Sequence, residues 1–382
     1  MSLVLLALPL TLAGIALYAL VAVYVERKVA AFIQDRLGPM EVGPKGIFQT
    51  AADIVKLLLK EGIVPAAADR LLFLLAPVVV FAAVFAGFAV IPWGAGWVAA
   101  PLQLGLLYVL AIVAVDVVGL LMAGWASNSK YALIGGVRSV AQIISYEVPA
   151  GTALLAGVVA YGTLDLQQMC LLQSSQSGQA LPVWGGLFDA GGYGGLLAWG
   201  VVRNPALLLA FGVYFIAGLA ENNRAPFDIP EAESELIAGF HTEYSGFRFA
   251  VFFLAEYAGM LLVSLLAAVV FLGGWSSPLP NLLAWDATEL AAGAGSVVAE
   301  LQGLQLHRLT TGTSGHWSAL LWGLFWLGTK AFVLVLVQMW VRWTWPRLRA
   351  DQLMRLCWKY LMPLAFGAVL LALAVRLAEV YA

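Results

Sequence analysis

Residues 205–244 decide the fold, and they read PALLLAFGVYFIAGLAE (205–221) followed by NNRAPFDIPEAESELIAGFHTEY (222–244). The first part is an apolar run of the length that forms a membrane-spanning helix, about 17–25 residues. Positions 221–243 hold six carboxylates, of which Glu221 ends the first part and five lie in the second, and Arg224 is the one Lys or Arg among them. A membrane chain gathers carboxylates where they meet water, protons, a cation or a partner protein.

The whole chain has the composition of a polytopic membrane protein. Of its 382 residues, 62% are hydrophobic and 11% are charged, whereas a soluble domain carries about 25% charged residues. The net charge of −2 gives no indication of a nucleic-acid partner. We therefore predict an all-α fold in which residues 1–382 form a single membrane domain. Apolar windows place eight spans at 3–25, 71–92, 102–124, 140–161, 205–221, 249–272, 318–341 and 361–380.

The basic residues predict the orientation of the chain. Sixteen of the 20 Lys and Arg residues fall on one set of connections and span ends. By the positive-inside rule this set is cytoplasmic, so both termini face outward. Two long connections, 162–204 and 273–317, then lie on the outer side, and their composition suggests no chemistry. The apolar run up to Val25 has no small-residue cleavage site, so we expect no cleavable signal.

The sequence predicts no redox centre on this chain. Cys170 and Cys357 are far apart, and an iron–sulfur cluster needs about four thiolates. The histidines lie in polar stretches rather than on spans, which argues against a haem: His241, His307 and His316. We expect neither a metal site nor a flavin.

The first cytoplasmic connection contains a short amphipathic helix, predicted within 44–61. Its polar residues recur at helical spacing and apolar residues cover most of the remaining surface, which is typical of a helix lying at the membrane interface. Such a helix is either a surface anchor or, with its polar edge, the wall of a cavity. Two Gly-Pro pairs precede it, at 38–39 and 43–44, and impose a fixed backbone path.

Four charged residues fall inside predicted spans: Asp116, Glu147, Glu256 and Lys330. The three acids each lie eight or nine residues from the cytoplasmic end of a span, hence about 12–14 Å deep, and half of a bilayer core is about 15 Å. They are either hydrogen-bonded packing residues or a chain of proton sites at similar depth. Lys330 lies deeper, and we expect it to pair with one of the acids.

The acidic connection at 221–248 has a partial local explanation. Asp228 and Glu231 have the spacing of a helix N-cap and its partner, with a proline in the first turn. On such a helix Asp228, Glu231 and Glu235 share a face, and Glu233 points elsewhere. Like charges at this spacing repel, so we expect them to face a hydrated cavity, to share protons or to meet a basic partner.

At this point the chain resembles the H-type membrane subunits of respiratory complex I, the proton-pumping NADH:quinone oxidoreductase. The resemblance covers nearly the whole chain and is weakest in the outer connections. The matching segments are Glu26-Arg27-Lys28; Arg36-x-Gly38-Pro39 with Val42-Gly43-Pro44; Ala52-Asp53-x-x-Lys56 with Lys60-Glu61; Ala68-Asp69-Arg70; 124–131; Ser145-Tyr146-Glu147; 220–244; Ala255-Glu256-Tyr257; and 346–354.

The resemblance implies a role that composition cannot show. It implies a subunit without a redox centre that helps to form a quinone chamber and couples quinone reduction to proton translocation in a bacterial inner membrane. The implied partners are iron–sulfur and quinone-site hydrophilic subunits, small membrane subunits and antiporter-like subunits. The chamber residues would be Glu26, Arg27, Arg36, Asp53 and Lys56. The proton path would comprise Glu147, Glu221, Asp228, Glu231, Glu233, Glu235 and Glu256. Asp116 and Lys330 are possible members from their depth alone and not from the resemblance.

Two departures and two alternatives accompany this resemblance. Many relatives have Asn-Arg where this chain has Met40-Glu41, and Asp116 matches no motif of the family. The first alternative is the related membrane subunit of an energy-converting hydrogenase or formate hydrogenlyase, although the match at 26–61 favours the quinone-reducing enzyme. The second is an autonomous ion transporter, which the absence of a visible internal repeat disfavours.

Overall fold

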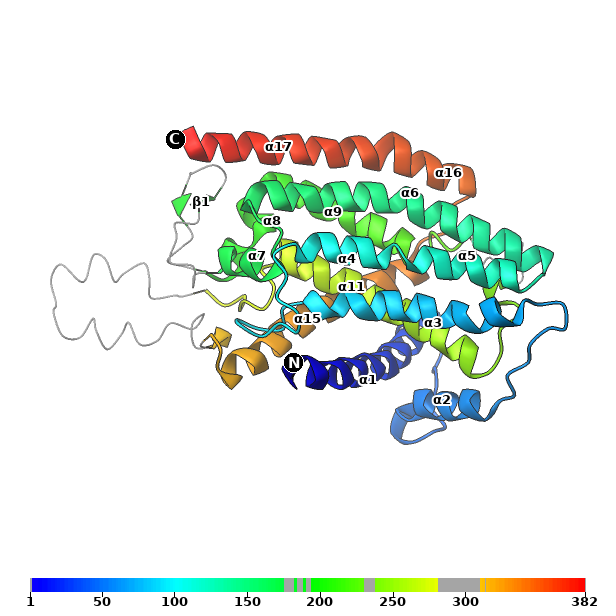
Figure 1. Ribbon diagram of the computed structural model, residues 1–382. Helices are drawn as coiled ribbons and strands as arrows, with labels where there is room; N and C mark the ends of the chain where they lie inside the picture. The colour runs from blue at the N-terminus through cyan, green and yellow to red at the C-terminus, as the bar shows by residue number, and fades with distance from the viewer. Residues whose placement is uncertain are drawn as a thin grey trace.

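The computed structural model describes residues 2–174, 182–183, 188–189, 194–229, 238–280, 310–312 and 314–381. Within these residues the protein is helical, as its composition predicts (Figure 1). The main helices are α1 (Ser2–Ile33), α3 (Arg70–Gly87), α4 (Gly105–Val113), α5 (Asp116–Ala126), α6 (Lys130–Tyr161), α9 (Pro205–Glu221), α11 (Phe247–Phe271), α15 (Trp317–Thr344) and α17 (Met362–Tyr381).

Shorter elements connect these helices. They are η1 (Pro44–Gly46), α2 (Gln49–Leu59), η2 (Phe88–Val90), α7 (Leu166–Leu172), η4 (Gly195–Ala198), α8 (Gly200–Arg203), η5 (Gly239–His241), α16 (Ala350–Arg355) and the π-helical η6 (Leu356–Leu361). The two-residue strands β1 (Pro182–Val183) and β2 (Phe188–Asp189) pair antiparallel.

The predicted spans each fall on an apolar helix or helix pair. In the described part of the chain, seven helices are long and apolar enough to cross a membrane, and the helix at 205–221 is apolar but shorter. Its 17 residues rise about 26 Å, somewhat less than a bilayer core of about 30 Å. The prediction of an all-α polytopic membrane protein is therefore confirmed.

Two predicted boundaries are wrong, and one predicted span is interrupted. The first helix continues through Glu26 to Ile33, because the Glu26 charge is neutralised inside the protein rather than exposed at a span end. The α6 helix begins at Lys130 instead of residue 140, since a helix continues beyond the stretch that hydropathy marks as apolar. The predicted span 102–124 is two helices, α4 and α5, separated at Ala114–Val115.

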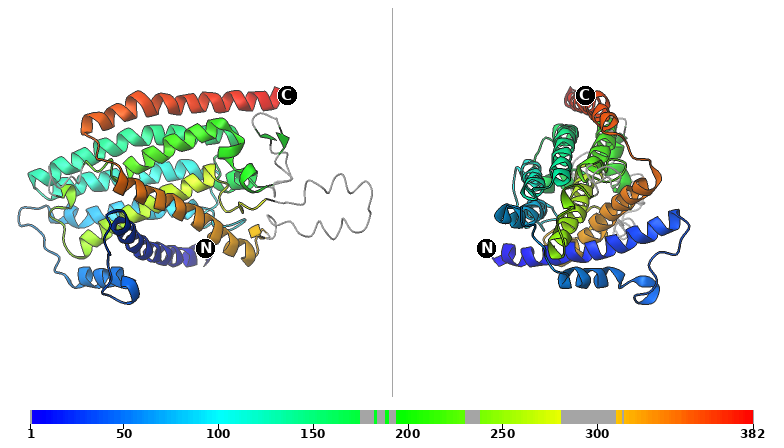
Figure 2. Two further views of the ribbon diagram at one scale, coloured as in Figure 1. Left: turned by 180° about the vertical axis from the view of Figure 1, so that it is seen from behind. Right: turned by 90° about the vertical axis from the view of Figure 1, so that its right-hand side faces the viewer.

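The α11 helix lies at the centre of the bundle. Of its most apolar window, 78% is buried, compared with at most 56% in any other long apolar helix of the described chain. It packs against α1, α3, α9 and α15, and the end-on view in Figure 2 shows helices on several sides of it. A side chain on α11 can therefore contact groups from most of the chain.

The α2 helix stands at the edge of the bundle beside α1 (Figure 2). Its Ile54, Val55, Leu58 and Leu59 side chains are all exposed, as expected of a helix that meets lipid or a partner chain. The Tyr24 hydroxyl of α1 donates a 3.0 Å hydrogen bond to the Lys45 carbonyl, which fixes the turn before α2.

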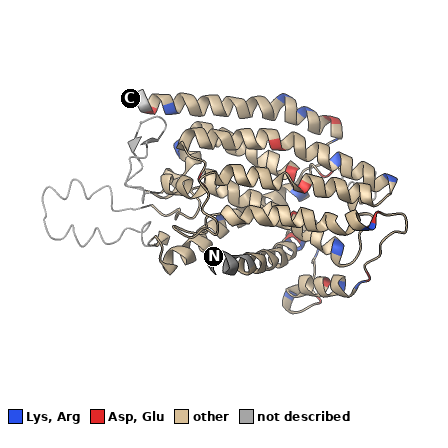
Figure 3. Ribbon diagram, in the orientation of Figure 1, with Lys and Arg blue, Asp and Glu red and all other residues tan. Residues whose placement is uncertain are grey.

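Both chain ends lie toward the end of the bundle opposite the α5–α6 connection (Figure 1). Most Lys and Arg residues gather at the α5–α6 end (Figure 3). This arrangement fits the basic-residue asymmetry that the sequence shows.

Candidate functional site

A buried ion network joins α1, α11, α15 and the turn after α9. Glu26 of α1 is 5% exposed, and it pairs with Arg342 of α15 and accepts a hydrogen bond from the Tyr257 hydroxyl of α11. Arg224 lies between two acids: Nη1 is 3.7 Å from Glu26 Oε1, and Nη2 is 3.8 Å from Glu256 Oε2. One guanidinium is therefore shared by two carboxylates from different helices.

Two ring side chains, Tyr257 and His241, also contact the ion network. The Arg224 guanidinium carbon lies 4.6 Å from the centre of the Tyr257 ring, a cation–π contact. The His241 Nε2 atom is 3.1 Å from Glu256 Oε1, and the His241 ring is 8% exposed. Glu256 thus contacts an arginine on one side and a histidine on the other, and both neighbours are donors that can stabilise its charge.

The chain turn after α9 places Arg224 in the network. Gln142 of α6 holds this turn, because its amide nitrogen lies 2.8 Å from the Ala220 carbonyl and 2.8 Å from the Phe227 carbonyl. Asn223 has a positive φ of 48° and donates to Ser139 at 3.0 Å. An asparagine tolerates this left-handed conformation better than most residues, so the sequence at the end of α9 is suited to the reversal.

Asp228 forms a second ion pair beside the network. Its Oδ2 atom accepts a 2.9 Å hydrogen bond from Arg347 Nη2. Burial raises the pKa of the Asp228 carboxyl above its ordinary value, and Arg347 opposes this increase. The predicted helix after Ile229, with Glu231, Glu233 and Glu235, lies outside the described residues.

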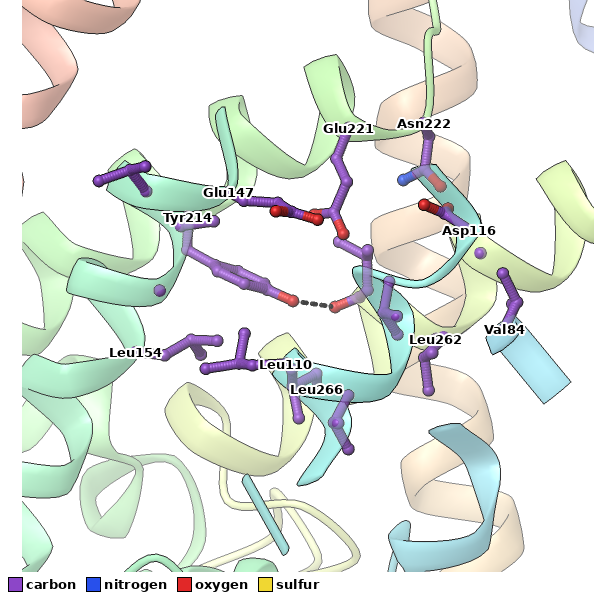
Figure 4. A pocket seen from close by; sticks show the side chains of 17 residues that line it. Val84, Leu110, Asp116, Glu147, Leu154, Tyr214, Glu221, Asn222, Leu262 and Leu266 are labelled. Atoms are coloured by element: carbon purple, nitrogen blue, oxygen red, sulfur yellow. Dashed lines mark hydrogen bonds between the residues drawn. The ribbon is translucent and has the colours of Figure 1, made fainter. Parts of the chain in front are cut away.

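The second feature is a cavity of about 290 Å³ between α4, α5, α6, α9 and α11. Three acids from three helices line it: Asp116, Glu147 and Glu221 (Figure 4). Apolar side chains such as Leu154 and Leu266 form the rest of its wall, and the Tyr214 hydroxyl in it donates to the Val263 carbonyl at 3.2 Å. Of the three acids predicted at similar depth, Asp116 and Glu147 line the cavity and Glu256 does not. Glu221 is the third acid of the cavity.

No cation pairs with the three acids of this cavity among the described residues. The buried Asp116 Oδ1 atom also has no hydrogen-bond partner there. Ionised carboxylates without partners are costly in apolar surroundings. Such a group suits a site that takes up and releases protons in contact with water.

The network and the cavity are neighbours along α11. Glu256 belongs to the network, while Gly259, Leu262 and Leu266 line the cavity. Three residues of helix rise about 4.5 Å, so Glu256 lies within about one turn of the cavity wall. Asn222 lines the cavity next to Glu221, two residues before Arg224.

The remaining predicted chamber residues lie apart from Glu26. Arg27 Nη1 and Asp53 Oδ2 form a 2.6 Å ion pair that ties α1 to α2, and both side chains are partly exposed. Arg36 and Lys56 are exposed. The structure therefore divides the predicted set into a buried member, Glu26, and an exposed group between α1 and α2.

Lys330 does not pair with an acid, contrary to expectation. Its ammonium donates to the carbonyls of Leu272, Gly274 and Ser276. These carbonyls follow the end of α11, so Lys330 reaches toward that end of the bundle rather than toward the carboxylates. A helix end offers unsatisfied carbonyls to a nearby cation, and sequence spacing does not show this.

Sequence reasoning missed the central partners of the network. Arg342 appeared as one of several basic residues at a span end, and Tyr257 and His241 carried no assignment. Glu26 and Arg342 are 316 positions apart, so no local spacing reveals their contact. The one available signal was that Arg224 is the sole Lys or Arg within the acidic stretch.

The fold and site define a polytopic membrane protein that holds titratable groups in its interior. The chain belongs to the NADH dehydrogenase family, whose pattern matches residues 6–373. It is 53% identical over 370 residues to the H subunit of the NADH-quinone oxidoreductase of Chlorobium luteolum, covering 97% of this chain and 87% of that protein.

Two further relatives show the same similarity. The H subunit of the NADH-quinone oxidoreductase of Chlorobaculum parvum is 51% identical over 94% of this chain and 88% of its own length. The H subunit numbered 2 of the NADH-quinone oxidoreductase of Cytophaga hutchinsonii is 49% identical over 94% of this chain and 95% of its own length. These names favour the quinone oxidoreductase expectation over the hydrogenase and transporter alternatives.

Proposed function

We propose that this chain is a membrane subunit of an NADH-quinone oxidoreductase that links a quinone-binding chamber to a proton path. The observation that carries the proposal is the contiguity along α11 of the Arg224 ion network and the three-acid cavity. A change of charge at the network can act on the cavity within about one helical turn. The chain supplies quinone contacts and proton sites, while the redox centres belong to other subunits.

The proposed chamber lies at the α1–α2 side. Glu26, Arg27, Arg36, Asp53 and Lys56 contribute its charged wall, and the Arg27–Asp53 pair fixes the distance between the two helices. Exposed apolar side chains on α2 and on α1, such as Phe32 and Leu58, offer a surface along which an isoprenoid tail can slide from the lipid.

The proposed proton path begins at the network and continues into the cavity. Asp228 and Glu256 begin this path at the ion pairs, and Asp116, Glu147 and Glu221 continue it in the cavity. Glu231, Glu233 and Glu235 are proposed as further members from the family resemblance. Carboxylates separated by water-filled space exchange protons through that water.

We further propose that the protein resides in a bacterial inner membrane with both termini outside. The basic residues at the α5–α6 end support this orientation. The hydrophilic subunits would then cover that end, where the chamber and Asp228 lie, and other membrane subunits would cover the lateral faces. The 44–61 segment would lie at the interface, and 221–248 would form the acidic cytoplasmic connection.

A test of the chamber is Arg36→Ala in the assembled enzyme, with Arg349→Ala as an exposed arginine control. The quinone KM should rise about tenfold in the first variant, since a charge-assisted hydrogen bond contributes about 1.5–3 kcal/mol, and stay unchanged in the second. Equal quinone KM values in Arg36→Ala and wild type, with unchanged inhibitor sensitivity, would contradict the chamber assignment.

A further inference from the structure

Lys330 is a buried charge that the proposed function leaves unexplained. It is 7% exposed and lies in the middle of α15. Its Nζ atom donates hydrogen bonds to the Leu272 carbonyl at 2.7 Å, the Gly274 carbonyl at 2.8 Å and the Ser276 carbonyl at 2.8 Å. Burying an ionisable residue within a membrane span costs free energy, so such a residue is a candidate for a functional role.

The contacts of Lys330 match the donor geometry of an ammonium group. An ammonium has three N–H donors, and the three carbonyls use all of them. The carbonyls follow the C-terminus of α11, which carries partial negative charge. The Trp199 ring lies 4.5 Å from Nζ on another side, and its face attracts a cation.

An apolar layer separates Lys330 from the acid cavity. Leu266 is the cavity residue farthest along α11, and Leu272 follows six residues later, about 9 Å further outward. The Phe271 ring fills this interval, with its centre 5.7 Å from that of Phe211 and 5.9 Å from that of Tyr214. Val270 and Phe271 are completely buried. The polar side chains beside this layer are engaged with backbone carbonyls: Tyr214 donates to Val263, Tyr161 donates to Val270, and Gln173 donates to Val269.

A cluster of buried hydroxyl groups lies on the outer side of Lys330. Ser276, Ser277 and Thr311 are almost completely buried. The Thr310 hydroxyl donates to Ser277 Oγ at 2.8 Å, and the Leu279 amide donates to the same atom at 3.2 Å. Hydroxyl groups can hold water, so the apolar layer and Lys330 together separate two polar regions.

We propose that Lys330 is a fixed positive charge that stops protons in the acid cavity from leaking to the outer side of the membrane. The inference rests on the proposed proton path through Asp116, Glu147 and Glu221. A proton that crosses the apolar layer as a hydrated cation must approach the ammonium and is repelled by it. The three carbonyls cannot deliver a proton, since they are acceptors, so the charge is not bypassed through them.

The first test compares Lys330→Gln with Lys330→Arg in the whole enzyme complex, reconstituted in liposomes with a trapped pH-sensitive dye. Proton flux under an imposed potassium diffusion potential is measured without NADH or quinone. A unit charge about 10 Å away at an effective dielectric constant of about 20 changes such a flux on the order of tenfold. Lys330→Gln keeps donors but loses the charge and should leak; Lys330→Arg should stay as tight as wild type.

Two outcomes of this comparison overturn the proposal. A tight Lys330→Gln variant would assign Lys330 to capping of α11 alone. Equal proton fluxes through the Gln and Arg variants would show that the shape of the side chain, and not its charge, blocks proton passage. The double variant Lys330→Gln with Glu147→Gln should be tight again, and a persistent leak there would show that protons bypass the cavity.

A second pair of variants leaves Lys330 in place and covers the case in which Lys330→Gln does not assemble. Ser277 Oγ accepts two hydrogen bonds, so an aspartate can keep both while adding a negative charge next to the Ser276 carbonyl. Ser277→Asp should leak several-fold more than its neutral match Ser277→Asn. Equal fluxes in these two variants would contradict the proposal.

These assays separate the inference from the function on which it rests. Passive proton flux is measured without electron transfer, whereas the proposed function is tested by quinone reduction and the proton-to-electron ratio in Glu147→Gln. Normal coupling in Glu147→Gln refutes the proposed path, and a tight Lys330→Gln refutes the barrier alone.

Discussion

The ion network and the acid cavity are adjacent, but the acids of the network face cations and the acids of the cavity do not. In the network each acid faces a cation: Glu26 contacts Arg224 and Arg342, and Glu256 contacts Arg224 and His241. In the cavity three acids face one another and apolar walls, without a cation among the described residues. Paired charges fix a geometry, because breaking a buried pair leaves a charge uncompensated. Acids without cations can instead change their protonation state with little rearrangement.

This difference suggests that the two regions along α11 have separate roles. The network holds α1, α11, α15 and the turn after α9 in place, and it responds as a unit when one charge is altered. The cavity provides sites for protons. We therefore expect substitutions in the network to affect stability first, and substitutions in the cavity to affect coupling first.

The largest effect should come from Arg224→Ala. It leaves Glu26 with one cation and Glu256 without an arginine, and removing one partner of a buried pair costs about 3–5 kcal/mol. The amount of chain assembled in membranes and the thermal stability of the purified complex should both fall. Arg349→Ala, an exposed arginine with no ion pair among the described residues, should leave both unchanged. Wild-type stability in Arg224→Ala would remove the distinction between the two regions.

Glu147→Gln should show the reverse pattern. Stability should change by less than about 1 kcal/mol, because an uncompensated acid is replaced by an amide of similar shape. Quinone reduction coupled to pumping should fall by roughly tenfold or more, since an amide cannot carry a proton. The measurements are thermal stability, quinone turnover and the proton-to-electron ratio in liposomes. Unchanged quinone turnover together with an unchanged proton-to-electron ratio would contradict the proton-path assignment.

Arg347→Ala converts a paired acid into an unpaired one, because it removes the arginine that pairs with Asp228. Burial already raises the pKa of Asp228, and loss of Arg347 should raise it further. An acid with a raised folded-state pKa loses stability as pH increases, because the unfolded chain releases its proton more readily. The stability deficit of the variant should therefore grow from about pH 4 to about pH 8, up to about 1–2 kcal/mol.

Asp228→Asn is the matched control for this pH dependence. It removes the titrating carboxyl, so the pH dependence that Asp228 contributes to the free energy of unfolding should be absent. Adding Arg347→Ala to this variant should introduce no further pH dependence. A deficit for Arg347→Ala that is the same at both pH values would show that Asp228 does not sense Arg347.

The smallest effect on stability should come from Asp53→Asn. The Arg27–Asp53 pair is partly exposed, and such pairs contribute about 0–1 kcal/mol. If the pair nevertheless positions α2 against α1, the quinone KM should rise several-fold at nearly unchanged thermal stability. Unchanged quinone KM would mean that the pair does not shape the chamber.

Hydropathy predicted the fold well, because long apolar runs in lipid have few structural solutions besides helices. The same reasoning failed at Glu26 and at Lys130. A span end was expected at Glu26, yet α1 continues to Ile33 since the charge is neutralised inside the bundle. Hydropathy measures the cost of a charge and not the presence of its partner.

The candidate site was predictable only in part. Depth along a helix brought Asp116 and Glu147 to the same level, and both line the cavity. Depth could not show that Glu256 faces Arg224 or that Lys330 faces carbonyls, because helix rotation and packing decide those contacts. The Glu26–Arg342 pair joins opposite ends of the chain, so it could be identified only in three dimensions.

That pairing of distant residues has a consequence for biosynthesis. Glu26 enters the membrane with the first helix, and its partner Arg342 is 316 positions later in the chain. Ribosomes add about 5–20 residues per second, so roughly 15–60 s separate the synthesis of the two. During this interval the first helix carries a carboxylate whose permanent cation does not yet exist. A chain truncated before α15 should therefore leave its first helix poorly anchored, and quality-control proteases should find it early.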